Sequence, residues 1–197
     1  LLLIGRTPLA DCTEWIDISA DHPQAAAVNA IRELERGGAS VHTASVDVGD
    51  PGAMAHFVQD YVKAGWPPIR GVVHAAGVLS HRSMVDLTAS DIAGVLRPKL
   101  AAWNVYRALK ETPLDFFVLF SSASALLGSP KLGAYAAGNS FLDTTAHYLR
   151  SQGVPALSVN WGVWSDAGMA SRFDAESVTA LIDRGMGAMR TEQAFEA

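Results

Sequence analysis

The chain is poor in cysteine, in charge and in long apolar runs. Cys12 is the one cysteine among 197 residues, which excludes an internal disulfide framework and favours a reducing compartment such as the cytoplasm. Only 18% of the residues are charged, the net charge is −5 and no basic cluster occurs, so nucleic acid is not expected as a partner. The apolar runs are strand-sized, too short to span a membrane. The six histidines are scattered, and no Cys/His cluster predicts a metal site.

The chain is rich in short apolar segments, each about as long as a β-strand. Hydrophobic residues make up 49% of it, enough for one domain with a sizeable core. The first residues, Leu1 to Gly5, read as a buried strand already under way. We therefore expect one domain over residues 1–197 that is incomplete at its N-terminal side.

Apolar strand-like runs alternate with helical patterns along the whole chain. Strands are expected over residues 1–5, 40–46, 69–74, 116–121 and 156–161, and helices over 24–36, 52–63, 89–110, 134–151 and 175–183. Strands that are apolar on both faces and separated by helices are typical of βαβ units. The sequence therefore predicts an α/β fold with a doubly wound parallel sheet.

Polar and small residues follow the predicted strands at the same end. They are Arg6, Asp47, the run Ala75-Ala76-Gly77, Ser122 and Gly162. In doubly wound sheets ligands bind beyond the carboxyl ends of the strands. These positions therefore predict a binding site along one edge of the sheet.

A second pattern involves Tyr135 and Asn139, which are four residues apart and share one helix face. A tyrosine beside a strand-end serine can donate a proton to a carbonyl, and Ser122 would help to polarise that carbonyl. Lys99 is the candidate that would lower the pKa of the tyrosine, since a positive charge favours the phenolate. Each residue also has an ordinary interpretation: a packing tyrosine, a serine cap, a surface asparagine and a solvated first-turn lysine after Pro98.

The strand ends also carry groups suited to a dinucleotide. The guanidinium of Arg6 could pair with a ribose 2′-phosphate, and the carboxylate of Asp47 could accept from an adenine amine. Small side chains at Ala75, Ala76 and Gly77 would let a flat cofactor approach the backbone. The alternatives are an isolated surface arginine, a helix-capping aspartate and a tight strand–helix turn.

Taken together, these motifs resemble the ketoreductase domains of modular type I polyketide synthases, which belong to the short-chain dehydrogenase/reductase superfamily. The resemblance runs through residues 46–50, 71–78, 98–100, 119–124, 128–130, 135–143 and 160–164, and extends to 184–186 and 192–194. Most short-chain reductases place a lysine four residues after the tyrosine. Here Asn139 stands there and the lysine, Lys99, lies on the preceding helix, an exchange that resembles the synthase ketoreductases.

The resemblance implies a Rossmann-like fold and a set of roles. Tyr135 would be the proton donor, Ser122 the carbonyl partner, and Lys99 and Asn139 their supports. By the same resemblance Arg6 binds the 2′-phosphate, so the cofactor would be NADPH. The other cofactor-binding positions would be Asp47, Val48, Ala75, Ala76, Gly77 and Gly162, together with Tyr135 and Lys99.

The resemblance also implies a reaction and partners. The substrate would be a β-ketoacyl thioester carried on an acyl carrier protein, reduced to the β-hydroxyacyl thioester beside the neighbouring domains of a synthase, with no membrane partner. The glycine-rich turn of the first βα unit has no counterpart here, so that unit is expected to be missing from this chain. The motifs associated with either alcohol configuration conflict, and no configuration is predicted.

Two other functions stay open. A reductase-like subdomain that only supports its neighbours would fit the missing turn, although such subdomains usually lack the catalytic residues. A free-standing short-chain dehydrogenase is the other alternative, and Asn139 in place of a lysine speaks against it.

Overall fold

The structure is a computed structural model of the chain, and it describes residues 1–13, 15, 18–127, 131–166, 168–169 and 187–196. Residues 128–130, which contribute to the resemblance, and the predicted helix at 175–183 lie outside this part. The chain divides into two compact units, Leu1–Trp66 and Pro67–Ala197, and each is described by itself. The prediction that residues 1–197 form one domain stays a prediction.

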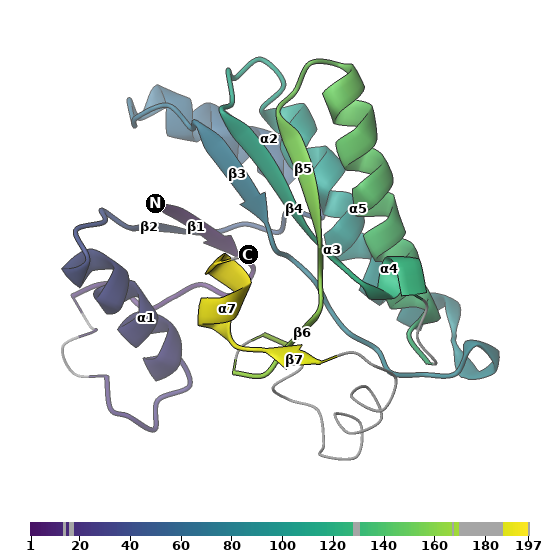
Figure 1. Cartoon of the computed structure of the whole chain (residues 1–197). Coiled ribbons are helices and arrows are strands. Elements are labelled where there is room, and N and C mark those ends of the chain that lie inside the picture. The colour runs from purple at the N-terminus through teal and green to yellow at the C-terminus, as the bar shows by residue number, and fades with distance from the viewer. Residues whose placement is uncertain (14, 16–17, 128–130, 167, 170–186, 197) are drawn as a thin grey trace. The chain divides into compact units, whose positions relative to one another are not determined.

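The first unit is a two-stranded parallel sheet with two helices (Figure 1). Strand β1 (Leu2–Gly5) pairs in parallel with β2 (His42–Ser45), and α1 (Ala25–Arg36) connects them. Helix α2 (Pro51–Lys63) follows β2. Apolar residues three or four positions apart form one buried stripe on each helix. These residues are Ala25, Val28 and Ile31 on α1, and Met54 and Val58 on α2.

Local sequence explains where these helices begin and end. Gly38 follows α1 with φ = 91°, a backbone conformation that residues with a Cβ rarely adopt. At the start of α2, the carboxylate of Asp50 accepts hydrogen bonds from the backbone N–H of Gly52 and Ala53, and Pro51 is the first helical residue. This is the arrangement that favours a helix N-terminus.

The second unit contains a three-stranded parallel sheet in the order β3-β4-β5. The strands are β3 (Gly71–His74), β4 (Phe116–Ser122) and β5 (Ala156–Trp161), and the long helices are α3 (Ala89–Ala108) and α5 (Gly133–Ser151). Figure 1 shows α3 and α5 side by side along this sheet. The core lies at this layer, where Phe117 and Leu119 of β4 are fully buried. The α/β prediction with parallel strands is confirmed.

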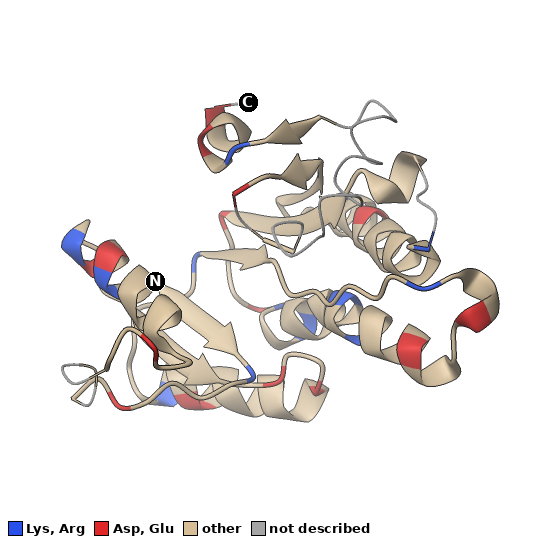
Figure 2. Cartoon of the chain, turned by 90° about the horizontal axis from the view of Figure 1, so that it is seen from below, with Lys and Arg blue, Asp and Glu red and all other residues tan. Residues whose placement is uncertain are grey.

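Several short elements were not predicted. They are the 3-10 turn η2 (Met84–Asp86), α4 (Ser124–Leu127), the parallel pair β6 (Val163–Trp164) and β7 (Ala188–Met189), and α7 (Thr191–Glu196). None is long enough to produce a hydrophobic period. Figure 2 shows Lys and Arg interspersed with Asp and Glu over the helices. Among the described helices, none combines the length and apolar character needed to cross a bilayer.

Candidate active site

Lys99 is a buried lysine in the middle of α3. Its exposed fraction is 2%, and Val95 and Ala102 on the same helix are buried with it. The spacing of four and then three residues places Lys99 on the stripe of α3 that faces the core. The alternative of a solvated first-turn residue is therefore wrong. A lysine on this stripe needs polar partners, because burying an unpaired ammonium is costly.

The partners of the Lys99 ammonium come from β4 and α5. Its Nζ donates to the carbonyl oxygen of Phe120 at 2.8 Å and lies 5.7 Å from the centroid of the Tyr135 ring, within the range of a cation–π contact. Burial lowers the pKa of Lys99 from 10.5 to about 8, and the charge of Asp143 partly opposes that shift. At neutral pH the side chain is therefore still mostly protonated.

Glycines leave room for this side chain. A Cβ at Gly77 would lie 3.3 Å from Cε of Lys99, and a Cβ at Gly138 would lie 3.2 Å from its Cγ. Both distances are tighter than ordinary contacts. The two glycines therefore let the segment after β3 and the first turns of α5 lie close to the lysine.

Tyr135 and Asn139 lie in the first turns of α5, as their spacing predicts. Asn139 is fully buried, and its Nδ2 donates to the backbone carbonyl of Tyr135 at 2.9 Å. Its Oδ1 is buried without a hydrogen-bond partner among the described residues. Because buried polar atoms are normally paired, this acceptor is suited to a donor brought by a ligand or an ordered water.

The pKa of Tyr135 departs from the expected direction. Burial raises the pKa of this phenol, and the side chains of Asn139 and Ser122 lower it in part. The prediction that the lysine would leave Tyr135 with a lowered pKa is therefore wrong for this structure, because the loss of solvation outweighs the neighbouring groups. A neutral phenol remains a proton donor at neutral pH.

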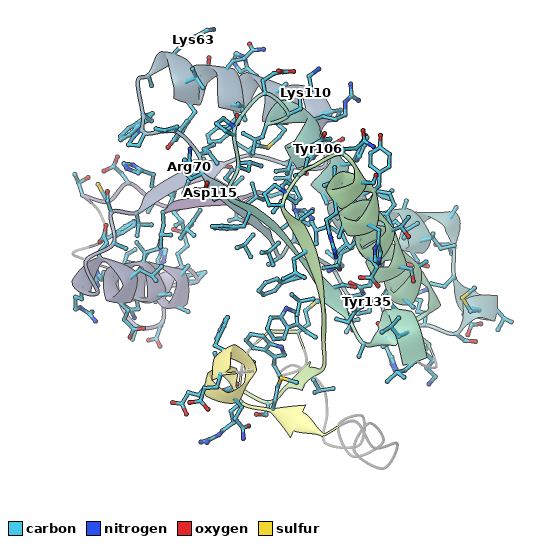
Figure 3. The ribbon with its side chains drawn as sticks, turned by 45° about the horizontal axis from the view of Figure 1, so that its top comes forward. Lys63, Arg70, Tyr106, Lys110, Asp115 and Tyr135 are labelled. Atoms are coloured by element: carbon cyan, nitrogen blue, oxygen red, sulfur yellow. The ribbon has the colours of Figure 1, made fainter. Side chains whose placement is uncertain are left out.

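Ser122 ends β4, where the strand reaches the carboxyl edge of the sheet. Its Oγ accepts hydrogen bonds from the backbone N–H and the hydroxyl of Ser124, at 3.2 and 3.1 Å. With its acceptor positions used this way, the hydroxyl hydrogen of Ser122 remains to be donated to an oxygen in front of it. Figure 3 places Tyr135 near α4, at the opposite end of the sheet from the Arg70–Asp115 ion pair.

His74 was not given a role in the sequence analysis, although it closes β3. It is 5% exposed, and its Nε2 lies 2.9 Å from the carbonyl oxygen of Pro98. Since a carbonyl only accepts, Nε2 carries the proton. Burial, and then the charge of Lys99, lower the pKa of His74 to about 4. A neutral histidine therefore ties β3 to the turn of α3 that carries Lys99.

The remaining predicted residues divide between the units. Ala75, Ala76 and Gly77 directly follow β3, and Gly162 directly follows β5, so these lie at the carboxyl ends of their strands in the second unit. Arg6, Asp47 and Val48 follow β1 and β2 in the first unit.

Arg6 is exposed. Asp47 accepts a hydrogen bond from the backbone N–H of Gly49 at 2.8 Å, whereas Asp50 caps α2. The helix-cap alternative for Asp47 is therefore wrong. The cofactor roles of all these residues stay predictions.

Comparison with known proteins identifies relatives over the whole chain. The family model described as "KR domain" matches residues 1–166. 6-Methylsalicylic acid synthase of Aspergillus terreus is 38% identical over 200 residues, which is 100% of this chain and 11% of that protein. A phenolphthiocerol synthesis polyketide synthase type I of Mycobacterium marinum is 40% identical over 164 residues, 82% of this chain and 8% of that protein. The chain thus spans about a tenth of the length of these relatives.

Solved structures give the same result for the fold. The ketoreductase from the first module of phoslactomycin biosynthesis in a Streptomyces species matches with a TM-score of 0.81 and 31% identity, covering 99% of this chain and 41% of that one. A structure of A-type ketoreductases from a modular polyketide synthase matches with a TM-score of 0.80 and 36% identity, covering 99% and 38%. These matches confirm the Rossmann-like, short-chain reductase class of the fold.

Proposed function

Because this chain belongs to the KR domain family, the ketoreductase domains of polyketide synthases, we propose that it reduces a β-ketoacyl thioester to the β-hydroxyacyl thioester with NADPH. The observation that carries the proposal lies within the second unit. The four residues come from three elements: Lys99 from α3, Ser122 from β4, and Tyr135 and Asn139 from α5. The ammonium of Lys99 lies 5.7 Å from the centroid of the Tyr135 ring, and Asn139 donates to the backbone carbonyl of Tyr135. The side chains of Asn139 and Ser122 lower the pKa of the Tyr135 phenol in part.

The residues on the chain supply the proton and hold the carbonyl. The hydroxyl of Ser122 donates to the carbonyl oxygen and polarises the C=O bond. Tyr135 transfers its phenolic proton to the same oxygen as negative charge develops there, so this oxygen becomes the hydroxyl of the alcohol and the tyrosine becomes a phenolate. The ammonium of Lys99, 5.7 Å from the ring centroid, stabilises that phenolate until a proton returns from solvent.

The residues present fit a nicotinamide cofactor. Small side chains follow β3, and Oδ1 of Asn139 is a buried acceptor without a partner among the described residues. Lys99 donates one N–H to Phe120 and has two further N–H groups for a ligand. NADPH, when bound, supplies the hydride that adds to the carbonyl carbon. Arg6 would hold its 2′-phosphate and Asp47 with Val48 its adenine. Residues 75–77 and Gly162, together with Tyr135 and Lys99, would contact the rest of it.

The relatives support the proposed substrate class. Both curated relatives are named as synthases, large proteins that this chain spans only in part. We therefore propose that the acyl chain arrives on an acyl carrier protein, in polyketide or related lipid synthesis in the cytoplasm, beside other domains of the same synthase.

The test uses the full-length protein with NADPH and a β-ketoacyl thioester. Tyr135→Phe removes the proton donor and is expected to lower turnover by about 10²–10⁴ while NADPH still binds. Tyr148→Phe is the matched control, because Tyr148 lies on the same helix with half of its surface exposed. Turnover is followed by NADPH absorbance and NADPH binding by fluorescence.

The outcome decides between the functions left open above. Equal rates in the Tyr135→Phe and Tyr148→Phe variants would refute the proton-donor role. If the wild-type protein neither turned over the thioester nor bound NADPH, the function of a supporting subdomain would be favoured. If it turned over free alcohols but not thioesters, a free-standing dehydrogenase would be favoured.

A further inference from the structure

The carboxylate of Asp143 occupies a position that the mechanism above does not use. Asp143 lies four residues beyond Asn139, so Tyr135, Asn139 and Asp143 follow one face of α5. Its Oδ1 accepts from the hydroxyl of Ser158 at 2.5 Å, and its Oδ2 accepts from Nδ2 of Asn160 at 2.9 Å. Both donors belong to β5.

Asn160 carries the connection onward to the catalytic strand. The same Nδ2 lies 3.2 Å from Oγ of Ser121 and 3.3 Å from the backbone carbonyl of Ser122. Ser121, in turn, donates to the backbone carbonyl of Asn139 at 3.2 Å. A short polar chain therefore leads from Asp143 to the backbones of two proposed catalytic residues, one on β4 and one on α5.

The third connection is electrostatic. Lys99 is buried and donates to the carbonyl of Phe120, the residue next to Ser121, which Asn160 connects to Asp143. The negative charge of Asp143 favours the protonated lysine and raises its pKa, against the larger effect of burial. The other titratable groups that face Lys99 are His74 on β3, neutral at neutral pH and itself influenced by the lysine charge, and Tyr135 on α5. Neither supplies a negative charge at neutral pH. Among the described groups that act on the ammonium of Lys99, Asp143 is therefore the negatively charged one.

We propose that Asp143 is a positioning residue of the reduction, which joins β4 and β5 to α5 and serves as the counter-charge of Lys99. The effect of Asp143 on turnover rests on the proposed function, whereas its effect on Lys99 does not. It predicts that loss of the carboxylate charge weakens the protonated state of Lys99 even when the hydrogen bonds are rebuilt.

Asp143→Asn is the informative variant because it removes the charge and can keep the contacts. The amide oxygen of the variant can accept from Asn160, and its NH₂ can donate to the hydroxyl of Ser158. Asp143→Ser removes the same charge with a smaller group. Two variants keep the charge: Asp143→Glu, and Ser158→Ala, which deletes a hydrogen bond and leaves the carboxylate in place.

The first readout needs no turnover. The full-length protein without cofactor is labelled briefly with acetic anhydride between pH 6 and 11, and modification of Lys99 is followed by peptide mass spectrometry. The exposed Lys63 and Lys110 serve as internal references. We expect the midpoint for Lys99 to fall by about one pH unit in Asp143→Asn and Asp143→Ser, and to stay near that of the wild type in Asp143→Glu and Ser158→Ala.

The second readout is the pH dependence of kcat/KM for NADPH. Its alkaline limb should move to lower pH by the same amount in the two charge-removing variants, which corresponds to a severalfold loss at pH 8 and little loss at pH 6.5. An unchanged midpoint and limb in these variants would overturn the inference, as would a folded Asp143→Glu beside unfolded Asp143→Asn and Asp143→Ser. Absence of turnover in the wild-type protein would refute the proposed function. The labelling experiment would still test the role of Asp143, because it does not depend on turnover.

Discussion

The two units differ most in what they bury. All the buried polar side chains of the described residues belong to the second unit, and they are His74, Lys99, Ser121, Ser124, Asn139 and Thr145. The buried residues of the first unit are apolar, and its candidate Arg6 is exposed. Burial of polar groups costs stability unless they are paired. In the second unit Oδ1 of Asn139 has no partner among the described residues, and burial lowers the pKa of Lys99. These two groups carry a cost at the place where the proposed chemistry occurs.

This difference leads to different expectations for substitutions. In the second unit, changes at buried polar residues should alter turnover and stability together, because those residues stand in the core. In the first unit, changes at exposed strand-end residues should alter the KM for the cofactor and leave both turnover and folding nearly unchanged. Three further predictions test this distinction.

The largest effect is expected for Lys99→Met, which should strongly lower turnover and yet stabilise the fold. Loss of the ammonium removes the support of the Tyr135 phenolate, and a decrease of at least about 10² in kcat is expected. At neutral pH the substitution also removes the cost of burying a charge, which is on the order of 1–3 kcal/mol. Turnover and the free energy of unfolding in urea are measured on the same protein.

The gain in stability should depend on pH in a defined direction. The folded pKa of Lys99, about 8, lies below its ordinary value of 10.5. Below pH 8 both folded and unfolded chains hold the proton, and the folded state bears the full cost. Between pH 8 and 10.5 the folded state releases its proton first, so the cost disappears. The advantage of Lys99→Met should therefore be largest at pH 7 and small at pH 10.5, whereas Lys110→Met, at an exposed lysine, should show neither effect.

Lys99 also shows how far the sequence could lead. The residue pattern made Lys99 a candidate support for Tyr135, and the resemblance gave it the same role. The helix around it was predicted to within two residues at its end. The sequence alone left a solvated lysine after Pro98 as an alternative. The stripe of Val95, Lys99 and Ala102 could have indicated burial, but a charged residue at a core position is interpretable only when its partners are known. Those partners, Phe120 and Asp143, come from other elements.

A smaller effect is expected in the first unit for Arg6→Ala. If the guanidinium pairs with the 2′-phosphate, its loss should raise the KM for NADPH by about tenfold, while kcat and the KM for NADH stay the same. Arg36→Ala is the matched control, since Arg36 lies in the last turn of α1 and is also exposed. Equal changes with NADPH and NADH, or none with either, would assign 2′-phosphate binding to other residues.

The register of the strands marks the limit of prediction from sequence. Tyr135, Asn139 and Asp143 have a helical spacing that the sequence displays, yet only the first two were assigned roles. The importance of Asp143 depends on Asn160 and Ser158 of β5. These reach it because Ser121 pairs with Asn160 across the parallel ladder. Periodicity within one strand carries no information on which residue of the next strand stands beside it.

The smallest effects concern two helix caps, one in each unit. Asp50 caps α2 through the N–H groups of Gly52 and Ala53, and Thr88 caps α3 in a reciprocal capping box with Asp91. Replacement of either residue by alanine should cost about 1 kcal/mol of stability, measured by urea unfolding.

The kinetic consequences of the two cap substitutions should differ, although their chemistry is alike. Asp50 directly follows the segment that carries Asp47 and Val48, so Asp50→Ala should loosen this segment and raise the KM for NADPH by about two- to threefold. Thr88 lies eleven residues before Lys99, which stays fixed by Phe120, so Thr88→Ala should leave KM and kcat unchanged. A rise in the KM for NADPH in Thr88→Ala alone would contradict the assignment of adenine binding to the segment of Asp47 and Val48. Equal stability losses with a KM change confined to Asp50→Ala would instead show that the helix cap in the first unit supports the binding of NADPH.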